Sequence, residues 1–531
     1  MKRHRPLMNS RQTPAAARAL RPPGALSAVP TLSAIPTLSA MPTLNAMLAL
    51  TAALALAACA VGPNYHRPAA PPDLAFKEDR GWKPATPGEI QADKPWWSIY
   101  DDPLLDSLEQ QVEVSNQTLK ADEAAYRAAV EVIGVDRGTF FPSVTATGAY
   151  TRSGSASGVN QAITAGGTTV TTGAGGSGRH SIYSAGAQAS WSIDVWGRIR
   201  RLVESDVAKA QASAADVAAA RLSAQITLAE DYFQLRAADE QTRLYQTDID
   251  DFKNALTITQ NQVKAGITTL ADVYAAETQL ESTQASAVGV QLTRAKYEHA
   301  IAVLIGKPPS ELGIDVGSFT TTVPVVPAGI PSTLLERRPD IAAAERLVAS
   351  ANALIGVAES AWYPSLTLTG SYGFTSSALG GLLSPKNSLW SFGPTLAESL
   401  FNGGATLAAT REARATYDEA VATYRQTVLS AFESVEDDLV TLRVLEQQGQ
   451  LQEAAVKDAR LSEQLTLNQY KSGIVVYSSV ITAQTTRLLD EINLLGIQSQ
   501  RLVSSVDLIS QLGGGWDATE LNRADRGVPS H

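Results

Sequence analysis

The chain contains a single cysteine, and its neighbours are typical of a cysteine that receives a lipid. Cys59 closes the run Leu56-Ala57-Ala58-Cys59, which resembles the bacterial lipobox. In that motif small residues admit the chain to the signal peptidase, and the thiol accepts a diacylglycerol group. A lone cysteine cannot form a disulfide within its chain. The alternative, a buried structural cysteine, is disfavoured by its place directly after an apolar run. Each buried methylene adds about 0.8 kcal/mol, so several acyl chains on Cys59 would form a firm membrane anchor.

The residues before Cys59 have the composition of a secretion signal. Residues 1–58 carry six Lys and Arg and no acidic residue, and they end in the apolar run from Met47 to Ala58. This pattern predicts a signal peptide over 1–58. Ala60 follows the cysteine where, in lipoproteins of this kind, an Asp would signal retention in the inner membrane. We therefore expect an outer-membrane location.

No other residues have the spacing of a reactive site. The five histidines lack metal-ligand spacing: His4, His66, His180, His299 and His531. Gly173, Gly175 and Gly178 match a dinucleotide fingerprint, but they lie in a Gly/Ser-rich stretch with no helix after them. No nucleophile has a partner base nearby in sequence. We expect no enzyme activity, no catalytic residues, no cofactor and no metal.

The charge of the chain argues against a polyanionic partner. The whole chain has a formal charge of −10, and without the leader 37 Lys and Arg face 53 Asp and Glu, which gives −16. A protein that binds phosphates needs an excess of cations on one face. We therefore expect no nucleic acid partner.

An internal repeat organises the rest of the chain. Residues of the first half recur 207 positions later, and the Phe141-Pro142 segment recurs 222 positions later as Tyr363-Pro364. Matches at a constant offset indicate one folding unit used twice. Those offset by 207 are Asn261, Gln262, Lys264, Gly266, Ile267 and Val273 with Asn468, Gln469, Lys471, Gly473, Ile474 and Val480.

Each repeat contains two segments that alternate between apolar and polar residues, as strands do. From Tyr183 to Val195 the alternation is unbroken, with Tyr183 and Trp191 on the apolar face. The other predicted strands are Ser143–Thr151, Leu366–Thr375 and Leu389–Ala397. A soluble antiparallel sheet gives the same alternation. The long Gly-, Ser- and Thr-rich loop at 153–180 favours a membrane barrel with external loops.

Four strands cannot enclose a lumen, and an open sheet edge in lipid leaves costly unpaired backbone groups. We therefore expect copies of the chain to join, and three copies would give twelve strands. After the leader no segment approaches the ~20 apolar residues of a spanning helix, so we expect only strands to cross the bilayer.

Between the hairpins lie helical tracts of unusual length. We predict helices over Arg198–Lys264, Thr269–Leu304, Ala405–Lys471 and Ser479–Leu512. The longer ones would extend roughly 100 Å. An ordinary coiled-coil stalk explains these lengths but not the hairpins between them.

Several motifs resemble those of the outer membrane efflux protein family, and within it the NodT-type lipoproteins that serve resistance-nodulation-division (RND) pumps. The resemblance runs from Cys59 to about Gly513. It is carried by Cys59 to Tyr65, Trp96-Trp97 with Asp102-Pro103-Leu104, Asp194 to Arg198, and Leu335 to Asp340.

The resemblance implies an α+β membrane protein built from a tandem repeat. It implies a homotrimer whose twelve-stranded β-barrel in outer-membrane lipid is continued by a long α-helical barrel across the periplasm. The predicted parts are a signal peptide (1–58), a lipidated segment (59–103), repeat 1 (104–320), a linker (321–331), repeat 2 (332–513) and a tail (514–531). External loops are expected at 153–180 and 376–388.

The breaks between the long helices are the predicted periplasmic tips. In the family such tips meet a periplasmic adaptor, and the residues implied for this contact are Gly266, Ile267, Thr268, Gly473, Ile474 and Val475. Gly266 and Gly473 suit helix C-caps. The apolar residues serve either contact or simple packing.

The resemblance also implies a gate near the tips. In TolC-like members acidic residues beyond the tip form rings and a tyrosine links adjacent helices, and here Asp272 and Tyr470 match those positions. Ser479 and Thr482 occupy the acidic positions of the second repeat, so this chain departs from the pattern. Thr269 to Asp272 also resembles a capping box, and we hold capping and gating by Asp272 as equal alternatives.

Together these features predict a passive exit duct for small toxic compounds, supplied by an inner-membrane RND transporter through the adaptor. A type I protein-secretion channel is the alternative within this architecture, and a non-conducting outer-membrane scaffold is the alternative outside it.

Overall fold

The computed structural model describes residues 60–69, 77, 95–154, 162–165, 168–171, 179–324, 337–516 and 521. All of them belong to a compact unit formed by Ala57–His531. The expected signal peptide and Cys59 lie outside the described residues.

The tandem repeat appears as pairs of helices of equal length. α4 (Arg198–Lys264) and α8 (Ala405–Lys471) each contain 67 residues. α5 (Leu270–Leu304) and α9 (Tyr477–Gln511) each contain 35 residues. Each second-repeat helix starts 207 positions after its counterpart, as the sequence predicts. α9 begins two residues before the predicted Ser479, directly after the extended residue Val476.

Shorter helices precede each hairpin. α3 (Gln117–Gly138) and α7 (Pro339–Ser360) have 22 residues each and are related by the offset of 222. In the first repeat α2 (Pro103–Ser115) comes before α3, and Asn116 separates them by capping α3 through the Leu119 N–H. Four short 3-10 helices complete the described connections: η1 (Trp96–Tyr100), η2 (Pro309–Glu311), η3 (Leu379–Gly381) and η4 (Pro385–Asn387).

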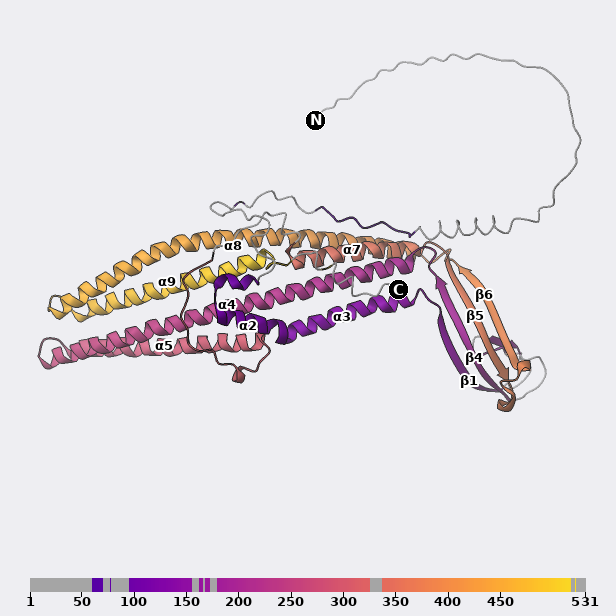
Figure 1. Cartoon of the computed structure of the whole chain (residues 1–531), viewed down its shortest axis with the longest axis horizontal. Coiled ribbons are helices and arrows are strands. Elements are labelled where there is room, and N and C mark those ends of the chain that lie inside the picture. Colours follow the sequence, from indigo (N-terminus) through magenta and orange to yellow (C-terminus); the bar gives the residue numbers. More distant parts are fainter. Residues whose placement is uncertain are drawn as a thin grey trace, which may run out of the picture. The chain divides into compact units, whose positions relative to one another are not determined.

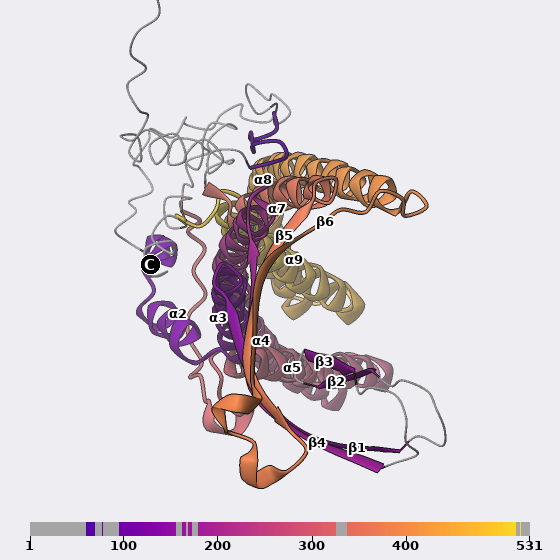
Figure 2. The same cartoon turned by 90° about the vertical axis from the view of Figure 1, so that its right-hand side faces the viewer.

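The four predicted membrane strands form one antiparallel sheet. They are β1 (Ser143–Gly154), β4 (Arg179–Ile193), β5 (Ser365–Ser376) and β6 (Ser388–Ala397), in the order β1-β4-β5-β6. Ser143 pairs with Ser190, Ile193 with Leu366, and Ser365 with Ala397. The sheet is curved, and β1 and β6 form its two edges (Figure 2).

The expected external loop over 153–180 contains structure of its own. The four membrane strands per chain are present as expected, but β1 continues to Gly154, β4 begins at Arg179, and a small separate hairpin lies between them. This hairpin pairs β2 (Ala162–Ala165) with β3 (Thr168–Thr171). Ile163, Val170 and the neighbouring threonines are β-branched and favour strands, which explains the added pairing.

The helices pack side by side beyond one end of the sheet (Figure 1). α4 packs against α3, α5, α7 and α9, and α8 packs against α7 and α9. The main core forms where these helices meet the N-terminal η1 and α2, and it includes the fully buried Tyr232, Phe233 and Tyr424. Trp96 and Trp97 also belong to this core, which explains their place in the sequence motif.

One helix contradicts the expectation that no later segment could span a membrane. α7 is long and apolar enough to do so by length and composition, but 67% of its apolar stretch is buried inside the protein. Its small residues pack between α4 and α8. The apolar character of α7 is therefore that of a core helix. Pro339 lies in its first turn and Asp340 follows, as the sequence predicts for a helix start.

Glycines mark the passage from each hairpin to its long helix. Gly197 caps α4 and Gly404 caps α8, both with positive φ (80° and 87°). Trp196 stacks on Tyr363 with ring centroids 4.8 Å apart, and its indole N–H donates to the Pro364 carbonyl at 2.8 Å. These contacts join the end of β4 to the start of β5, so the two hairpins leave the helices as one sheet.

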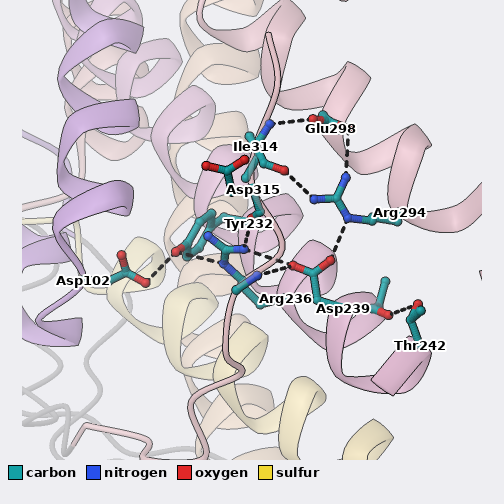
Figure 3. A network of polar contacts seen from close by, with 11 residues as sticks. Asp102, Tyr232, Arg236, Asp239, Thr242, Arg294, Glu298, Ile314 and Asp315 are labelled. Atoms are coloured by element: carbon teal, nitrogen blue, oxygen red, sulfur yellow. Dashed lines mark hydrogen bonds and ion pairs between the residues drawn. The ribbon is translucent and has the colours of Figure 1, made fainter. Parts of the chain in front are cut away.

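A buried polar network, which we call the linker network, holds the segment after α5, near the end of repeat 1, against α4 and α5 (Figure 3). Asp239 is its centre: it accepts from Arg236 at 3.0 Å, from Arg294 at 2.6 Å and from the Gly317 N–H at 3.1 Å. Its side chain is 1% exposed. The other members are Asp102, Tyr232, Glu298, Ile314 and Asp315.

The two arginines of the linker network also bind backbone carbonyls of the segment after α5. Arg236 donates to the Asp315 carbonyl at 2.8 Å, and Arg294 donates to the Ile314 carbonyl at 2.5 Å. Tyr232 accepts from Arg236 and donates to Asp102, whose other carboxylate oxygen caps α2. The network therefore fixes the start of α2, the body of α4 and the segment after α5 to one another.

Candidate functional site

The two helix–helix connections lie at the end of the long helices farthest from the sheet (Figure 1). Each is closed by a glycine with positive φ, 71° at Gly266 and 74° at Gly473. The Ile267 N–H donates to the Gln262 carbonyl at 2.8 Å, and the Ile474 N–H donates to Gln469 at 2.9 Å. This is the Schellman pattern, in which glycine adopts the left-handed conformation without a steric penalty. The predicted C-caps are therefore present.

The apolar residues of the tips are exposed to solvent. Ile267 is 68% exposed and Ile474 is 72% exposed, and Leu270, Tyr274 and Val476 beside them are also exposed. Val475 is half-buried against a small cluster inside the tip, and Thr268 is also half-buried. Of the apolar pair proposed at the second tip, Ile474 is therefore available for contact and Val475 mainly packs. Large apolar side chains gathered at one end of a molecule indicate an interaction surface.

Asp272 caps the start of α5. Its carboxylate accepts from the Thr269 N–H at 3.2 Å, from the Thr269 hydroxyl at 3.1 Å and from the Thr268 hydroxyl. The Thr268 hydrogen bond, with those of Thr269, lowers the pKa of Asp272 below its ordinary value despite some burial. Asp272 is therefore charged at neutral pH, and the capping contacts that the sequence predicted are present.

Tyr470 is buried and joins two long helices of the same chain. Its hydroxyl lies 3.1 Å from the Thr259 hydroxyl, which links α8 to α4. Burial raises the pKa of Tyr470, and the negative charge of Asp272 contributes to the increase. The structure thus brings Asp272 and Tyr470 into one electrostatic neighbourhood. Ser479 is half-buried, and Thr482 is exposed and donates to the Ser478 carbonyl of its own helix at 2.9 Å.

Sequence reasoning missed a second tyrosine at this place. Tyr477 is 1% exposed, and its ring centroid lies 5.3 Å from that of Tyr470. Its hydroxyl is buried without a hydrogen-bond partner in the described part of the chain. Burial raises the pKa of Tyr477 to about 12. The only signal in the sequence was an aromatic residue at the first position of a helix.

A buried ionic cluster nearer the middle of the helices was also missed. Arg487 on α9 pairs with Asp248 on α4, with Glu463 on α8 at 2.5 Å, and with Glu491 at 2.8 Å. Arg460 of α8 also pairs with Glu491 at 2.7 Å. Burial raises the pKa of Asp248 to about 6, although Arg487 opposes the increase. The cluster joins α4 to the α8–α9 pair, and its members lie too far apart in sequence to form a motif.

The residues gathered at the tips provide apolar contact, negative charge and buried aromatic packing. In the described part of the chain, no three His, Cys, Asp or Glu residues are arranged to hold a metal ion. What the tips offer is an exposed apolar end, a charged Asp272 and buried tyrosines that hold the helices together.

The chain matches the family model for outer membrane efflux proteins over residues 108–307 and 330–514. It is 29% identical over 464 residues to the probable efflux pump outer membrane protein TtgC of Pseudomonas putida, an alignment that covers 86% of this chain and 93% of TtgC. It is 27% identical over 469 residues to the probable outer membrane lipoprotein SilC of Salmonella typhimurium, which covers 87% of this chain and 96% of SilC. The solved outer-membrane channel OprN superposes with a TM-score of 0.76 at 28% identity, over 86% of this chain and all of OprN.

Proposed function

Because the chain belongs to the outer membrane efflux protein family, we propose that it is the outer-membrane channel component of a tripartite RND-type efflux pump. It lets small toxic compounds leave the cell through a passive duct. The observation that carries this function is the joining of a curved sheet, apolar on one face and open at both edges, to four helices of exceptional length. The family is one of channel proteins, and the duct makes no covalent change to its cargo.

The open edges support assembly of three copies. β1 and β6 have free edges, and strand direction alternates from β1 to β6 because all neighbours are antiparallel. β6 of one copy can therefore pair antiparallel with β1 of the next. Three copies joined in this way give a closed barrel of twelve strands with no edge in the lipid.

The repeat predicts the register of this seam. Inside the chain Ile193 of β4 pairs with Leu366 of β5. The repeat relates β4 to β6 by an offset of +207 and β5 to β1 by an offset of −222. Ile193 therefore corresponds to Leu400, and Leu366 corresponds to Val144. The same pairing between copies places Leu400 of one copy opposite Val144 of the neighbouring copy. Leu400 is 90% exposed and Val144 is 70% exposed in the single chain. We call this pairing the seam register.

The alternation of side chains supports the seam register independently. Five of the six exposed large apolar residues on the two edge strands occupy even positions, Leu389 at 37% exposure being the exception, and the seam register places even positions opposite even ones. The apolar face thus continues from copy to copy, whereas a shift by one residue would set apolar beside polar residues. The five at even positions are Val144 and Tyr150 on β1, and Trp390, Phe392 and Leu396 on β6.

The packing of the helices next to the sheet also supports the assembly of three copies. Fourteen of the 22 residues of α7 are buried, because α7 packs between α4 and α8. In α3, its counterpart, only Leu119 and Ile133 are buried, and Val132 and Val135 are exposed. α3 packs against α4 alone among the long helices. In the trimer, α8 of the neighbouring copy takes the place that α4 takes beside α7.

The two ends of the duct have different partners. Cys59 carries the lipid that anchors the chain in the outer membrane, and the apolar tips around Ile267 and Ile474 bind the periplasmic adaptor. An inner-membrane RND transporter supplies the energy. At the tips, Asp272 contributes one carboxylate per copy to a ring, Tyr470 holds adjacent helices of the gate together, and Ser479 and Thr482 occupy the gate positions of the second repeat. Charges in so narrow a lumen are weakly screened.

Conductance in a planar bilayer tests this function. The purified protein is expected to give discrete current steps that favour cations. Asp272→Asn is expected to reduce the cation preference, and, through the lost cap, to destabilise the start of α5 by about 1 kcal/mol. Asp250→Asn, which removes a 61% exposed carboxylate on α4, is the matched control.

The conductance experiment distinguishes a channel from a scaffold without a pore, and gating by Asp272 from helix capping alone. Absence of current identifies a scaffold without a pore and contradicts the channel. An unchanged cation preference in Asp272→Asn with a less stable helix leaves capping as the only role of Asp272. Neighbouring genes distinguish the cargo: an adaptor with a proton-driven transporter supports efflux, and an ABC transporter with a secreted protein supports type I secretion.

A further inference from the structure

The segment directly after Cys59 has neither helix nor strand, yet its backbone is held at almost every residue. The Val61 N–H donates to the Trp196 carbonyl at 3.0 Å. Arg201 donates through Nε to the Val61 carbonyl and through Nη2 to the Gly62 carbonyl, both at 3.1 Å. Arg201 is 4% exposed. A buried arginine that binds two consecutive carbonyls fixes both the position and the direction of the chain.

Side chains of α4 and α7 hold the rest of the segment. Arg201 Nη2 also donates to the Asn64 side-chain oxygen at 2.9 Å, and Asn352 donates to the Pro63 carbonyl at 3.0 Å. The Tyr65 hydroxyl donates to Glu345. Burial, with Glu345 beside it, raises the pKa of Tyr65 well above its ordinary value. We call residues Ala60–Tyr65, bound in this way, the anchor dock.

The shape of the anchor dock depends on three glycines. Gly62 has a φ of 96°, and a Cβ there would lie 2.4 Å from the Gly356 Cα. A Cβ on Gly356 would lie 2.7 Å from the Val61 carbonyl oxygen, and one on Gly197 would lie 2.8 Å from the Ala60 Cα. The segment can therefore approach α4 and α7 this closely only where these positions lack side chains.

The repeat-related helices, α3 of the first repeat and α8 of the second, lack the side chains that hold the segment in the anchor dock. The counterparts of Arg201, Asn352 and Gly356 are Ala408, Val130 and Gly134. Ala408 and Val130 cannot donate to a carbonyl, and a Cβ on Gly134 would meet nothing within 4 Å. The residues of the anchor dock therefore serve something that occurs once per chain.

We propose that the anchor dock sets the depth of the lipid anchor relative to the barrel, so that acyl chains and strands enter the outer membrane as one rigid body. Consecutive Cα atoms are about 3.8 Å apart, so Cys59 lies within one residue of Ala60, which contacts Gly197 at the junction of β4 and α4. The acyl chains thus start where the sheet begins. This inference rests on the proposed lipidation of Cys59, with Arg201 as the positioning residue.

An insertion that lengthens the tether tests the inference. Ala-Gly-Ser-Gly-Ser-Gly inserted between Cys59 and Ala60 keeps an alanine after the cysteine and leaves the anchor dock intact, but frees the lipid from it. The same insertion between Pro68 and Ala69, beyond the anchor dock, is the matched control. Palmitate labelling measures lipidation, and protease-resistant trimer in outer-membrane fractions measures assembly.

We expect normal labelling of both variants and a roughly fivefold loss of assembled trimer for the first insertion alone, because a longer tether lowers the effective concentration of the strands at the membrane. Arg201→Ala is expected to reproduce this loss with unchanged labelling. Circular dichroism of each purified variant in detergent is expected to show the unmodified helix content.

Equal assembly of the two insertion variants would overturn the positioning role while leaving the lipid anchor and the channel in place. Absence of palmitate from the unmodified chain would instead overturn the lipidation of Cys59, and this inference with it. Labelling therefore tests the lipidation of Cys59, and assembly separately tests the positioning role of the anchor dock.

Discussion

Asp239→Ala is expected to lower the free energy of unfolding by about 3–5 kcal/mol, because it leaves two arginines of the linker network without their shared carboxylate. Arg236 and Arg294 are 9% and 19% exposed, so neither can recover its hydration when Asp239 is removed. The Gly317 N–H loses its acceptor as well. Thermal unfolding of the purified protein in detergent, followed by circular dichroism, measures the effect.

The repeat supplies the control for this substitution. Glu446 and Arg501 are the counterparts of Asp239 and Arg294, but they lie 4.0 Å apart with side chains 57% and 25% exposed. Exposed pairs contribute little, so Glu446→Ala is expected to cost less than about 1 kcal/mol. Equal losses for the two alanine variants would show that the buried linker network stabilises the protein no more than the exposed pair does.

Cross-linking at the seam register is expected to convert most of the protein into a covalent trimer. Thr147→Cys with Ala397→Cys places the two thiols directly opposite each other between neighbouring copies. Facing residues of antiparallel strands have Cα atoms about 4.5–5.5 Å apart, which a disulfide can bridge. Cys59 is the one cysteine of the natural sequence, and the proposed lipidation would occupy its thiol. Denaturing electrophoresis after mild oxidation, without reducing agent, detects the product.

A shifted pair of cysteines provides the control for the seam. Thr151→Cys with Ala397→Cys moves one thiol four residues along β1, which separates the pair by about 13 Å along the strand. This variant is expected to remain monomeric on the gel. Cross-linking of the shifted pair in place of the facing pair would contradict the seam register, although it would still indicate an assembly through β1 and β6.

The sequence predicted the long helices and the membrane strands because both depend on local patterns. The offset of 207 placed α8 and α9 once α4 and α5 were recognised, and strict alternation placed β4 within a few residues. The glycines at 266 and 473 predicted the tips for the same reason, since a helix C-cap is decided by the residues next to it. The Asp272 cap is also local.

Features that depend on distant residues could not be predicted. Arg487 and Asp248 are 239 positions apart, and nothing in the neighbourhood of either predicts their contact. The contact of Arg201 with the segment after Cys59 spans about 140 positions and was equally hidden. α7 was missed as a possible spanning helix because small residues such as alanine and glycine make a core helix and a membrane helix alike in composition. In each case the role of the residue or helix depends on neighbours that are distant in sequence, and the local sequence does not identify them.

The mass of the protein in mild detergent tests the central claim most directly. One chain contributes four strands to the membrane sheet and leaves two edges open, so the account requires three copies to enclose water. Native mass spectrometry of the protein extracted from outer membranes is expected to give a species of three chains that each carry a lipid. A species of one chain under the same conditions, with its sheet folded, would contradict the account.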